Sequence, residues 1–492
     1  MNKSRREFIA GTAWMGAAAM AAGCMSRNAS QCGIGGGGAA PMHGFRVAPM
    51  KRVRVGIIGV GGRGTPAVHR LAQIPGCEVT ALSDINPDRL DAAQKWLKEH
   101  GYRPAREWSR DGREDSWKGL CDWDGVDVVY SATPRPLHCA INVYAMSCGK
   151  HVMQEVPGVF NLDECWATVE AAEKYRRHCY MLENACYGEY ELLAFKLIKK
   201  GKLGEIVQSE VCYTHDQRKI QYNPSDGVFW RIDRHMTHHG NYYPTHGLVP
   251  AGKSLDINRG DRFDFLISVE TKSASFETFG KAKFPEDDRV VGVDGKPLNR
   301  HTAKMVKGDV NTCLMRTVNG KVLQLVHNVC TPCPYDRGNK YLGTKGTVLG
   351  ITEESFRVGF EEEIGDNGAH KYFSAEKAAQ VREMYMHPMW KAASEIAKKV
   401  GGHGGIDFIM DLRWVYCLQN GLPMDTDVYD LATYSAVVEL SERSVNSGSR
   451  PVEFPDFTRG GWKYAKPFAV ETIDMSKFDF KKLTKDADAL TT

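Results

Sequence analysis

The sequence predicts an α/β protein that opens with a doubly wound parallel sheet and continues into a second, strand-rich domain. Three observations support this prediction. Residues 53–60 form an apolar run interrupted only by Arg54, which is typical of a strand buried on both faces. A glycine-rich turn follows at once, and strand and helix patterns then alternate as far as Asn184. From Gly204 onward the segments EIVQSEVCYTH, RFDFLISVET, KVLQLVHNV and GTVLGIT all predict strands.

The turn after the first predicted strand has the spacing Gly59-x-Gly61-x-x-Gly64 and opens a helix pattern. Its glycines permit a tight turn and let a pyrophosphate approach the N-terminus of that helix. The segment CEVTALSD predicts a second strand that ends at Asp84, twenty residues after Gly64. A carboxylate there binds ribose hydroxyls and repels a 2′-phosphate. We therefore expect NAD rather than NADP, the alternative being a glycine turn without a ligand.

Further patterns complete the first domain. Residues 87–101 predict a helix, VDVVYSAT and KHVMQE predict strands, and another helix runs through Met146. Asn161 and Glu164 predict a capping box for a helix that ends near His178, and YMLEN predicts the last strand. The expected domains are a nucleotide domain at 51–185, a substrate domain at 186–455 and a tail at 456–492.

The first 24 residues resemble a twin-arginine export signal. Arg5 and Arg6 lie in SRREFI, and a mild, Ala-rich apolar stretch follows. The segment AAGC, which ends at Cys24, resembles a lipoprotein cleavage box, so either a lipid anchor at Cys24 or a plain signal cut nearby is expected. Residues 25–50 lack periodicity and predict a flexible linker. We expect an exported, periplasmic protein, either free or anchored to the membrane.

The composition is that of an ordinary globular protein, and 492 residues are enough for two domains. The formal net charge is +4 and no basic stripe alternates with aromatic residues, so nucleic acid is not an expected partner. Helices are predicted at 374–400, 405–420 and 428–443. The Met and Trp residues between 384 and 414 lie at helical spacing, which fits either core packing or a homo-oligomer contact.

Two further groups of residues have alternative interpretations. Cys330-x-x-Cys333 has the spacing of a redox or metal pair, and we favour a local disulfide formed after export. His235, His238 and His239 include an i, i+4 pair of the kind that binds metals. No acidic or cysteine partner follows at a supporting distance, so we predict no metal site.

Three motifs in order resemble the glucose–fructose oxidoreductase-like dehydrogenases: GVGGRG at 59–64, ATPxxxH at 132–138 and GKHVxxEVP at 149–157. The resemblance implies a Rossmann nucleotide domain followed by an α+β domain with an open, mostly antiparallel sheet. In those enzymes an E-K-P motif carries a catalytic lysine. Val156 occupies that position here, and an apolar side chain cannot move a proton, so an ordinary sugar dehydrogenase becomes the second choice.

A longer set of segments resembles the NAD-dependent α-N-acetylgalactosaminidases of glycoside hydrolase family 109. The segments are LENACYG at 182–188, YTHDQR at 213–218, WRIDRHMTHHGNYYPTHGLVPAGKSLDINRGDRFD at 230–264, and HNVCTPCPYDR with GTKG between 327 and 346. Together they span most of residues 52–350. The chain departs from the family in lacking its tryptophans at 134–138 and in having Asn328 for Asp and Cys333 for Arg, which bears on the exact sugar more than on the chemistry.

The resemblance implies roles for the matching positions. Those expected to bind the cofactor are Gly59, Gly61, Gly62, Arg63, Gly64 and Asp84 on the adenosine and pyrophosphate side, with Arg135, His138, Glu155, Val156 and Asn184 on the nicotinamide side. Those expected to surround the sugar are Tyr213, Arg231, Tyr243, Pro244, Thr245, His246 and Tyr335.

The implied reaction oxidises C3 of the sugar by hydride transfer to a tightly held NAD. The C2 proton is then removed, the C1 substituent leaves by elimination, water adds and the hydride returns, with retention at C1. Such a site needs groups that exchange protons near neutral pH rather than two carboxylates. We expect His246 and Tyr243 to handle the C3 hydroxyl and C2 protons and Tyr335 to act near the leaving group. A sugar oxidoreductase and a non-catalytic carbohydrate-binding relative are the alternatives.

Overall fold

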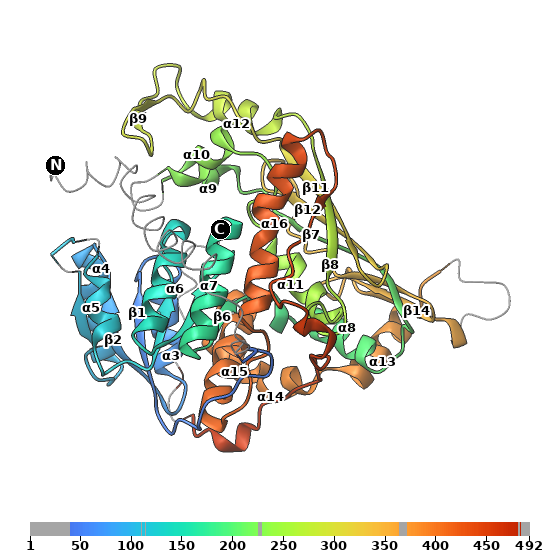
Figure 1. Cartoon of the computed structure of the whole chain (residues 1–492), viewed down its shortest axis with the longest axis horizontal. Coiled ribbons are helices and arrows are strands. Elements are labelled where there is room, and N and C mark those ends of the chain that lie inside the picture. Colours follow the sequence, from blue (N-terminus) through green and yellow to red (C-terminus); the bar gives the residue numbers. More distant parts are fainter. Residues whose placement is uncertain are drawn as a thin grey trace, which may run out of the picture.

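The computed structural model describes residues 40–109, 111–113, 115–224, 229–363, 371–480 and 483. The predicted export signal, Cys24 and most of the predicted linker therefore lie outside the described residues. Two sheets organise the described chain, and helix α16 (Val428–Asn446) runs between them, packed against both (Figure 1). None of the described helices has the length and apolar character needed to cross a membrane.

The first sheet is parallel throughout, as predicted. Within the described residues its strand order is β3-β2-β1-β4-β5-β6. The order reverses between β1 and β4, and ligands of doubly wound folds bind at such a switch point, beyond the carboxyl ends of the strands. The strands are β1 Val53–Ile58, β2 Cys77–Ser83, β3 Arg106–Trp108, β4 Val128–Ser131, β5 His151–Glu155 and β6 Cys179–Leu182, and the helices are α3 Gly64–Ala72, α4 Pro87–Glu99, α5 Trp117–Asp122, α6 His138–Ser147 and α7 Leu162–Tyr175.

The second sheet is open and mostly antiparallel, as predicted. Its order among the described strands is β15-β14-β13-β7-β12-β11-β8-β16, and β7 with β12 is its parallel pair. The sequence did not predict β11, which lies between β12 and β8. The strands are β7 Ile206–Thr214, β8 Phe263–Glu270, β11 Val310–Thr317, β12 Val322–Asn328, β13 Lys340–Gly343, β14 Gly346–Leu349, β15 Arg357–Phe360 and β16 Val452–Glu453, with β9 Val290–Val291 and β10 Pro297–Leu298 paired separately.

Helices of the C-terminal half cover this sheet and reach back to the first. They are α8 Glu189–Lys199, α9 Arg218–Tyr222, α10 Trp230–Thr237, α11 Thr245–Ser254, α12 Ser275–Lys283, α13 Ala375–Tyr385, α14 Pro388–Val400 and α15 Ile406–Asn420. The single helix predicted at 374–400 is wrong, because Pro388 starts a new helix and the preceding His387 accepts a hydrogen bond from Met389 N–H at 3.2 Å. The helices predicted at 405–420 and 428–443 are confirmed.

The start of α7 differs in detail from the predicted capping box. The Asn161 side chain accepts from Glu164 N–H at 2.8 Å, as expected. The Glu164 carboxylate instead accepts from Phe160 N–H at 2.7 Å, one residue before the cap. The helix ends at Tyr175 rather than near His178, because Arg176 adopts a left-handed conformation with φ of 52°.

The predicted Cys330–Cys333 disulfide is also wrong, since both cysteines are free thiols. Cys330 is buried, and its Sγ lies 3.9 Å from His235 Nδ1. His235 and His239 have separate partners, because His239 Nδ1 lies 2.9 Å from a Glu270 carboxylate oxygen. The described residues contain no cluster of three or more His, Cys, Asp or Glu side chains suited to a metal.

The C-terminal segments contribute to the core. Of the Met and Trp residues at helical spacing, those buried are Met389, Trp390, Met410 and Trp414. The described part of the tail crosses the surface of α15, where Phe478 packs beside Tyr416. This arrangement ties the last third of the chain to the nucleotide domain, since α15 contacts both α3 and β1.

Candidate active site

The positions predicted to bind the cofactor gather at the carboxyl edge of the first sheet. Residues 59–64 follow β1, Asp84 follows β2, residues 135–138 follow β4, Glu155 ends β5 and Asn184 follows β6. Parallel strands deliver their carboxyl ends to one edge, so residues distant in sequence come together there. The location of each position at or just after the carboxyl end of a parallel strand therefore explains why these positions share a site.

The glycine-rich turn has the geometry of a dinucleotide cradle. Gly59 has φ of +86°, and a Cβ added at Gly64 would lie 1.8 Å from the Gly59 carbonyl oxygen, so only glycine fits there. A Cβ added at Gly62 would meet nothing within 4 Å. The buried Asp84 carboxylate accepts from Val60 N–H at 2.7 Å and from Asn86 N–H at 2.8 Å. Each oxygen retains a second lone pair for a ribose hydroxyl, so these residues fit NAD.

Two carboxylates hold the Arg63 guanidinium over this edge. Its Nη2 donates to Glu155 Oε1 at 3.1 Å, and its Nη1 donates to Asp407 Oδ2 at 3.1 Å. Glu155 Oε1 also accepts from the Tyr130 hydroxyl at 2.9 Å. Asn184 Nδ2 donates to the other Asp407 oxygen at 2.6 Å. Asp407 was missed from the sequence, where the segment GGHGGID at 401–407 is its one local signal.

The segment from 135 to 157 is buried and closely packed. The His138 nitrogens lie 2.9 Å from Gly158 O and 3.0 Å from Thr133 O, and burial lowers its pKa to about 4. The buried Arg135 guanidinium donates to Tyr242 O at 2.7 Å and to Val159 O, so it joins the two domains rather than standing free. Val156 is half-buried and precedes a cis peptide bond to Pro157.

Four of the predicted sugar-site residues form one cluster of rings. The Tyr213 ring stacks on Tyr243, with 5.1 Å between centroids, and meets His246 edge-on at 4.8 Å. The Tyr335 ring lies 6.1 Å from Tyr213, and Tyr243 lies 5.1 Å from His246. Tyr213 is the penultimate residue of β7 and His246 lies in the first turn of α11, while Tyr243 precedes that helix instead of belonging to it. Burial raises the pKa of both Tyr213 and Tyr243, so both phenols are protonated at neutral pH.

A buried carboxylate orients His246. Glu183 Oε1 lies 2.7 Å from His246 Nδ1 and also accepts from Ala185 N–H at 3.0 Å. Burial acts to raise the pKa of Glu183, but the adjacent His246 and the hydrogen bonds outweigh it, and the pKa lies below its ordinary value. An ionised Glu183 selects the tautomer with hydrogen on Nδ1, which leaves His246 Nε2 as the proton acceptor. Glu183 lies in the segment LENACYG, but no local pattern in the sequence connects it to His246.

Tyr213 ends a chain of hydrogen bonds that leads into the core. Gln217 Nε2 donates to the Tyr213 hydroxyl oxygen at 2.7 Å, and Gln221 Nε2 donates to Gln217 Oε1 at 3.0 Å. The Tyr242 hydroxyl donates to Gln221 Oε1 at 2.7 Å and lies 3.3 Å from His235 Nε2. Because Gln217 donates to the Tyr213 oxygen, the Tyr213 hydroxyl hydrogen is available for a different acceptor.

The remaining residues of the predicted sugar site lie around the same cluster of rings. Arg337 Nη1 donates to the Tyr335 hydroxyl at 2.7 Å and its Nε donates to Glu191 at 2.6 Å, so a buried ion pair holds Tyr335. Burial raises the pKa of Tyr335 despite this cation. Arg231 packs over the Trp230 ring at 4.2 Å, and burial lowers its pKa. Pro244 and Thr245 are buried at the start of α11.

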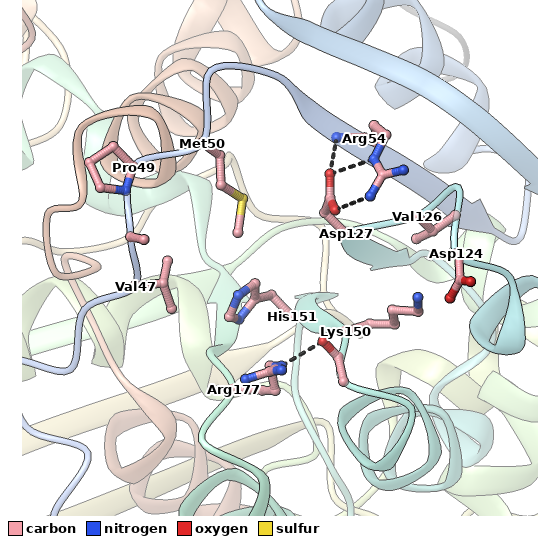
Figure 2. A pocket seen from close by; sticks show the side chains of 12 residues that line it. Val47, Pro49, Met50, Arg54, Asp124, Val126, Asp127, Lys150, His151 and Arg177 are labelled. Carbon is pink, nitrogen blue, oxygen red and sulfur yellow. Dashed lines mark hydrogen bonds and ion pairs between the residues drawn. The ribbon is translucent and has the colours of Figure 1, made fainter.

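A separate cavity of about 630 Å³ lies at the opposite, amino edge of the first sheet (Figure 2). Its Arg and Lys side chains already have partners: Arg54 pairs with Asp127 through bonds of 2.9 and 2.6 Å, and Lys150 donates to a backbone carbonyl at 3.0 Å. Arg177 likewise donates to a backbone carbonyl. These pairs leave the carboxyl edge, with its ring cluster, as the candidate active site.

The fold and this site define an enzyme with an NAD-binding Rossmann domain followed by a domain built on an open, mostly antiparallel sheet. Residues 53–183 match the family described as "Oxidoreductase family, NAD-binding Rossmann fold", and residues 187–464 match "Glycosyl hydrolase 109, C-terminal domain". The structure is similar to levoglucosan dehydrogenase in complex with NADH and levoglucosan, with a TM-score of 0.60 and 18% identity over 82% of this chain and 100% of that one. At that identity the likeness concerns the fold.

Relatives closer in sequence fix the family. A glycosyl hydrolase family 109 protein of Solibacter usitatus is 40% identical over 447 residues, which is 89% of this chain and 97% of that protein. Glycosyl hydrolase family 109 protein 1 of Bacteroides thetaiotaomicron is 40% identical over 421 residues, covering 84% and 86%. The chain belongs to glycosyl hydrolase family 109.

Proposed function

We propose that the protein hydrolyses terminal α-linked N-acetylgalactosamine, or a closely related α-glycoside, through transient oxidation of the sugar at C3. The observation that carries the proposal is the orientation of His246 by Glu183 among three tyrosines. The nearby carboxylates of Glu155, Glu183 and Glu191 all have protein partners. Each of them is already engaged with a cation or with His246, which disfavours an acid–nucleophile pair.

The residues divide the proton transfers among them. NAD, held by the glycine turn at residues 59–64 and by Asp84, would supply reversible hydride chemistry at C3 of the sugar. His246 Nε2 accepts the C3 hydroxyl proton and, after passing it to water, the C2 proton, because Glu183 holds the hydrogen on Nδ1. The Tyr243 and Tyr335 phenols remain protonated and donate, Tyr335 at the leaving group. Arg231 binds a polar substituent of the sugar.

Deuterium incorporation tests the elimination route. The protein is incubated with p-nitrophenyl α-N-acetylgalactosaminide in deuterated water, and the released sugar is analysed for deuterium at C2. We expect incorporation that disappears in His246→Ala and is reduced in Tyr243→Phe. Cleavage without exchange would contradict the elimination.

A sugar oxidoreductase is the alternative, since the fold is shared with levoglucosan dehydrogenase. Val156 disfavours it, because this position offers no proton-transferring group. NADH that accumulates in step with substrate loss would support the oxidoreductase, whereas a glycosidase with resident NAD produces none.

We also propose export by the twin-arginine route, with retention of NAD through the passage. The SRREFI segment and the preformed glycine cradle support this proposal. Fractionation of cells that produce the wild type, an Arg5→Lys/Arg6→Lys variant and Cys24→Ser separates the alternatives. Loss of periplasmic protein in the first variant supports export, and release from the membrane fraction in the second supports a lipid anchor.

A further inference from the structure

The first turn of α15 places one carboxylate between two predicted cofactor positions. Asp407 Oδ2 accepts from Arg63 at 3.1 Å and Oδ1 accepts from Asn184 at 2.6 Å. Arg63 follows β1 and Asn184 follows β6, so they lie on loops from separate strands of the first sheet. The Asp407 side chain is 1% exposed, whereas Arg63 is 35% exposed. The carboxylate is therefore the buried, fixed member of the group, and Arg63 is the member that extends outward.

A role as a counter-ion for the buried Arg70 does not account for Asp407. Asp411, one turn later on the same helix, already serves Arg70, with 2.8 Å between Arg70 Nε and Asp411 Oδ2. Asp407 lies farther from Arg70, at 3.6 Å. The shorter contacts of Asp407 are those with the loops at the carboxyl edge.

The backbone before α15 is shaped to bring Asp407 to this place. Gly402, His403, Gly404 and Gly405 all have positive φ, between 48° and 100°. A Cβ at Gly405 would lie 2.8 Å from the Ala397 backbone, so the helix can begin here only after a glycine. His403 Nδ1 approaches the same Asp407 oxygen, at 2.9 Å, from the solvent side.

We propose that Asp407, supported by His403, is a positioning residue for the dinucleotide: it holds Arg63 and Asn184 in place, so that a helix from the far end of the chain latches the NAD-binding edge. This inference rests on the proposed function, in which NAD stays bound through the catalytic cycle. It adds that retention depends on the C-terminal domain as well as on the Rossmann loops.

The test measures NAD retention in the full-length protein, independently of turnover. NAD released by denaturing each purified variant is quantified per chain, and the NAD dissociation constant is measured by calorimetry after the nucleotide is stripped. We expect Asp407→Asn to weaken binding about 10- to 100-fold, because Arg63 loses a charge-assisted hydrogen bond. His403→Ala removes a partly exposed contact and should weaken NAD binding less. This variant also provides the test if Asp407→Asn does not fold.

Asp411→Asn is the matched control, because it removes a buried carboxylate from the same face of α15 but leaves the contacts of Asp407 with Arg63 and Asn184 in place. We expect it to lower the melting temperature while leaving the NAD dissociation constant within about twofold of wild type. In an Arg63→Gln/Asp407→Asn double variant the losses are less than additive, since Asp407 acts partly through Arg63.

The outcomes separate this inference from the proposed function. Wild-type protein that carries and binds no NAD would overturn both. Wild type that retains NAD, together with Asp407→Asn and His403→Ala variants that retain it equally well, would overturn the latch alone. An equal loss of NAD in Asp411→Asn would also overturn it, because the effect would then be one of general stability.

Discussion

Replacing Glu183 by glutamine tests the catalytic assignment most directly. The change keeps the shape of the side chain but removes the charge that lies 2.7 Å from His246 Nδ1. A hydrogen bond to a charged group contributes about 1.5–3 kcal/mol, so losing it slows any step that charges His246 by about 10- to 100-fold. The glutamine amide can also donate to Nδ1 and move the hydrogen to Nε2. In serine-protease triads this tautomer change costs about 10⁴-fold in turnover, which sets the upper limit here.

The assay follows initial rates of p-nitrophenol release from the α-N-acetylgalactosaminide, with NAD content and melting temperature measured on the same samples. His43→Gln is a matched control, because it removes another histidine–carboxylate contact of 2.9 Å, with Asp427, away from the ring cluster. We expect the control to lose stability but not turnover per folded molecule. A Glu183→Gln protein that is folded, loaded with NAD and as active as wild type would refute the orienting role of the carboxylate.

Gln217→Leu removes the donor to the Tyr213 oxygen and should lower hydrolysis roughly threefold to tenfold with little change in melting temperature; an unchanged rate would contradict the role of the chain. Gly64→Ala should cost about 1–3 kcal/mol or more in urea unfolding and abolish NAD binding, because the added Cβ meets a carbonyl, whereas Gly62→Ala should stay within about 0.5 kcal/mol of wild-type stability. The pKa of His138 is lowered to about 4, so its contribution is fully present above pH 6.5 and is lost as the pH falls toward 4; by pH 5 about 2 kcal/mol of unfolding free energy is lost, and His138→Asn should reduce that loss.

The first domain could be predicted because its signals are local. The apolar run from Val53, the glycine spacing and the carboxylate at Asp84 each fix one unit of a repeating strand–helix pattern. Part of the ring cluster could also be predicted, since Tyr243 and His246 lie three residues apart. Tyr213 and Tyr335 came from the family resemblance, and the structure brings both to the same rings.

The missing parts depend on contacts between distant segments. Glu183 lies 63 residues before His246, and Asp407 lies 344 residues after Arg63, so no local pattern connects either pair. The strand β11 was missed because its alternation is interrupted by polar residues such as Asn311, whose side chain bonds to Ser268 across the sheet. Pro388 indicates the break before α14. The helical spacing of residues on both sides nevertheless favoured one continuous helix.

The parallel pairing of β7 with β12 has a consequence for engineering. Tyr213 pairs with His327 in that register, so β7 and β12 end at the same edge of the sheet. The segments that follow the two strands therefore begin side by side. Residues 215–216 and 329–334 can therefore be exchanged together, with Gln217, Tyr335 and Arg337 kept, to change the surroundings of the ring cluster. The nucleotide-binding domain needs no redesign, so this edge is the place to build libraries that test the proposed sugar specificity.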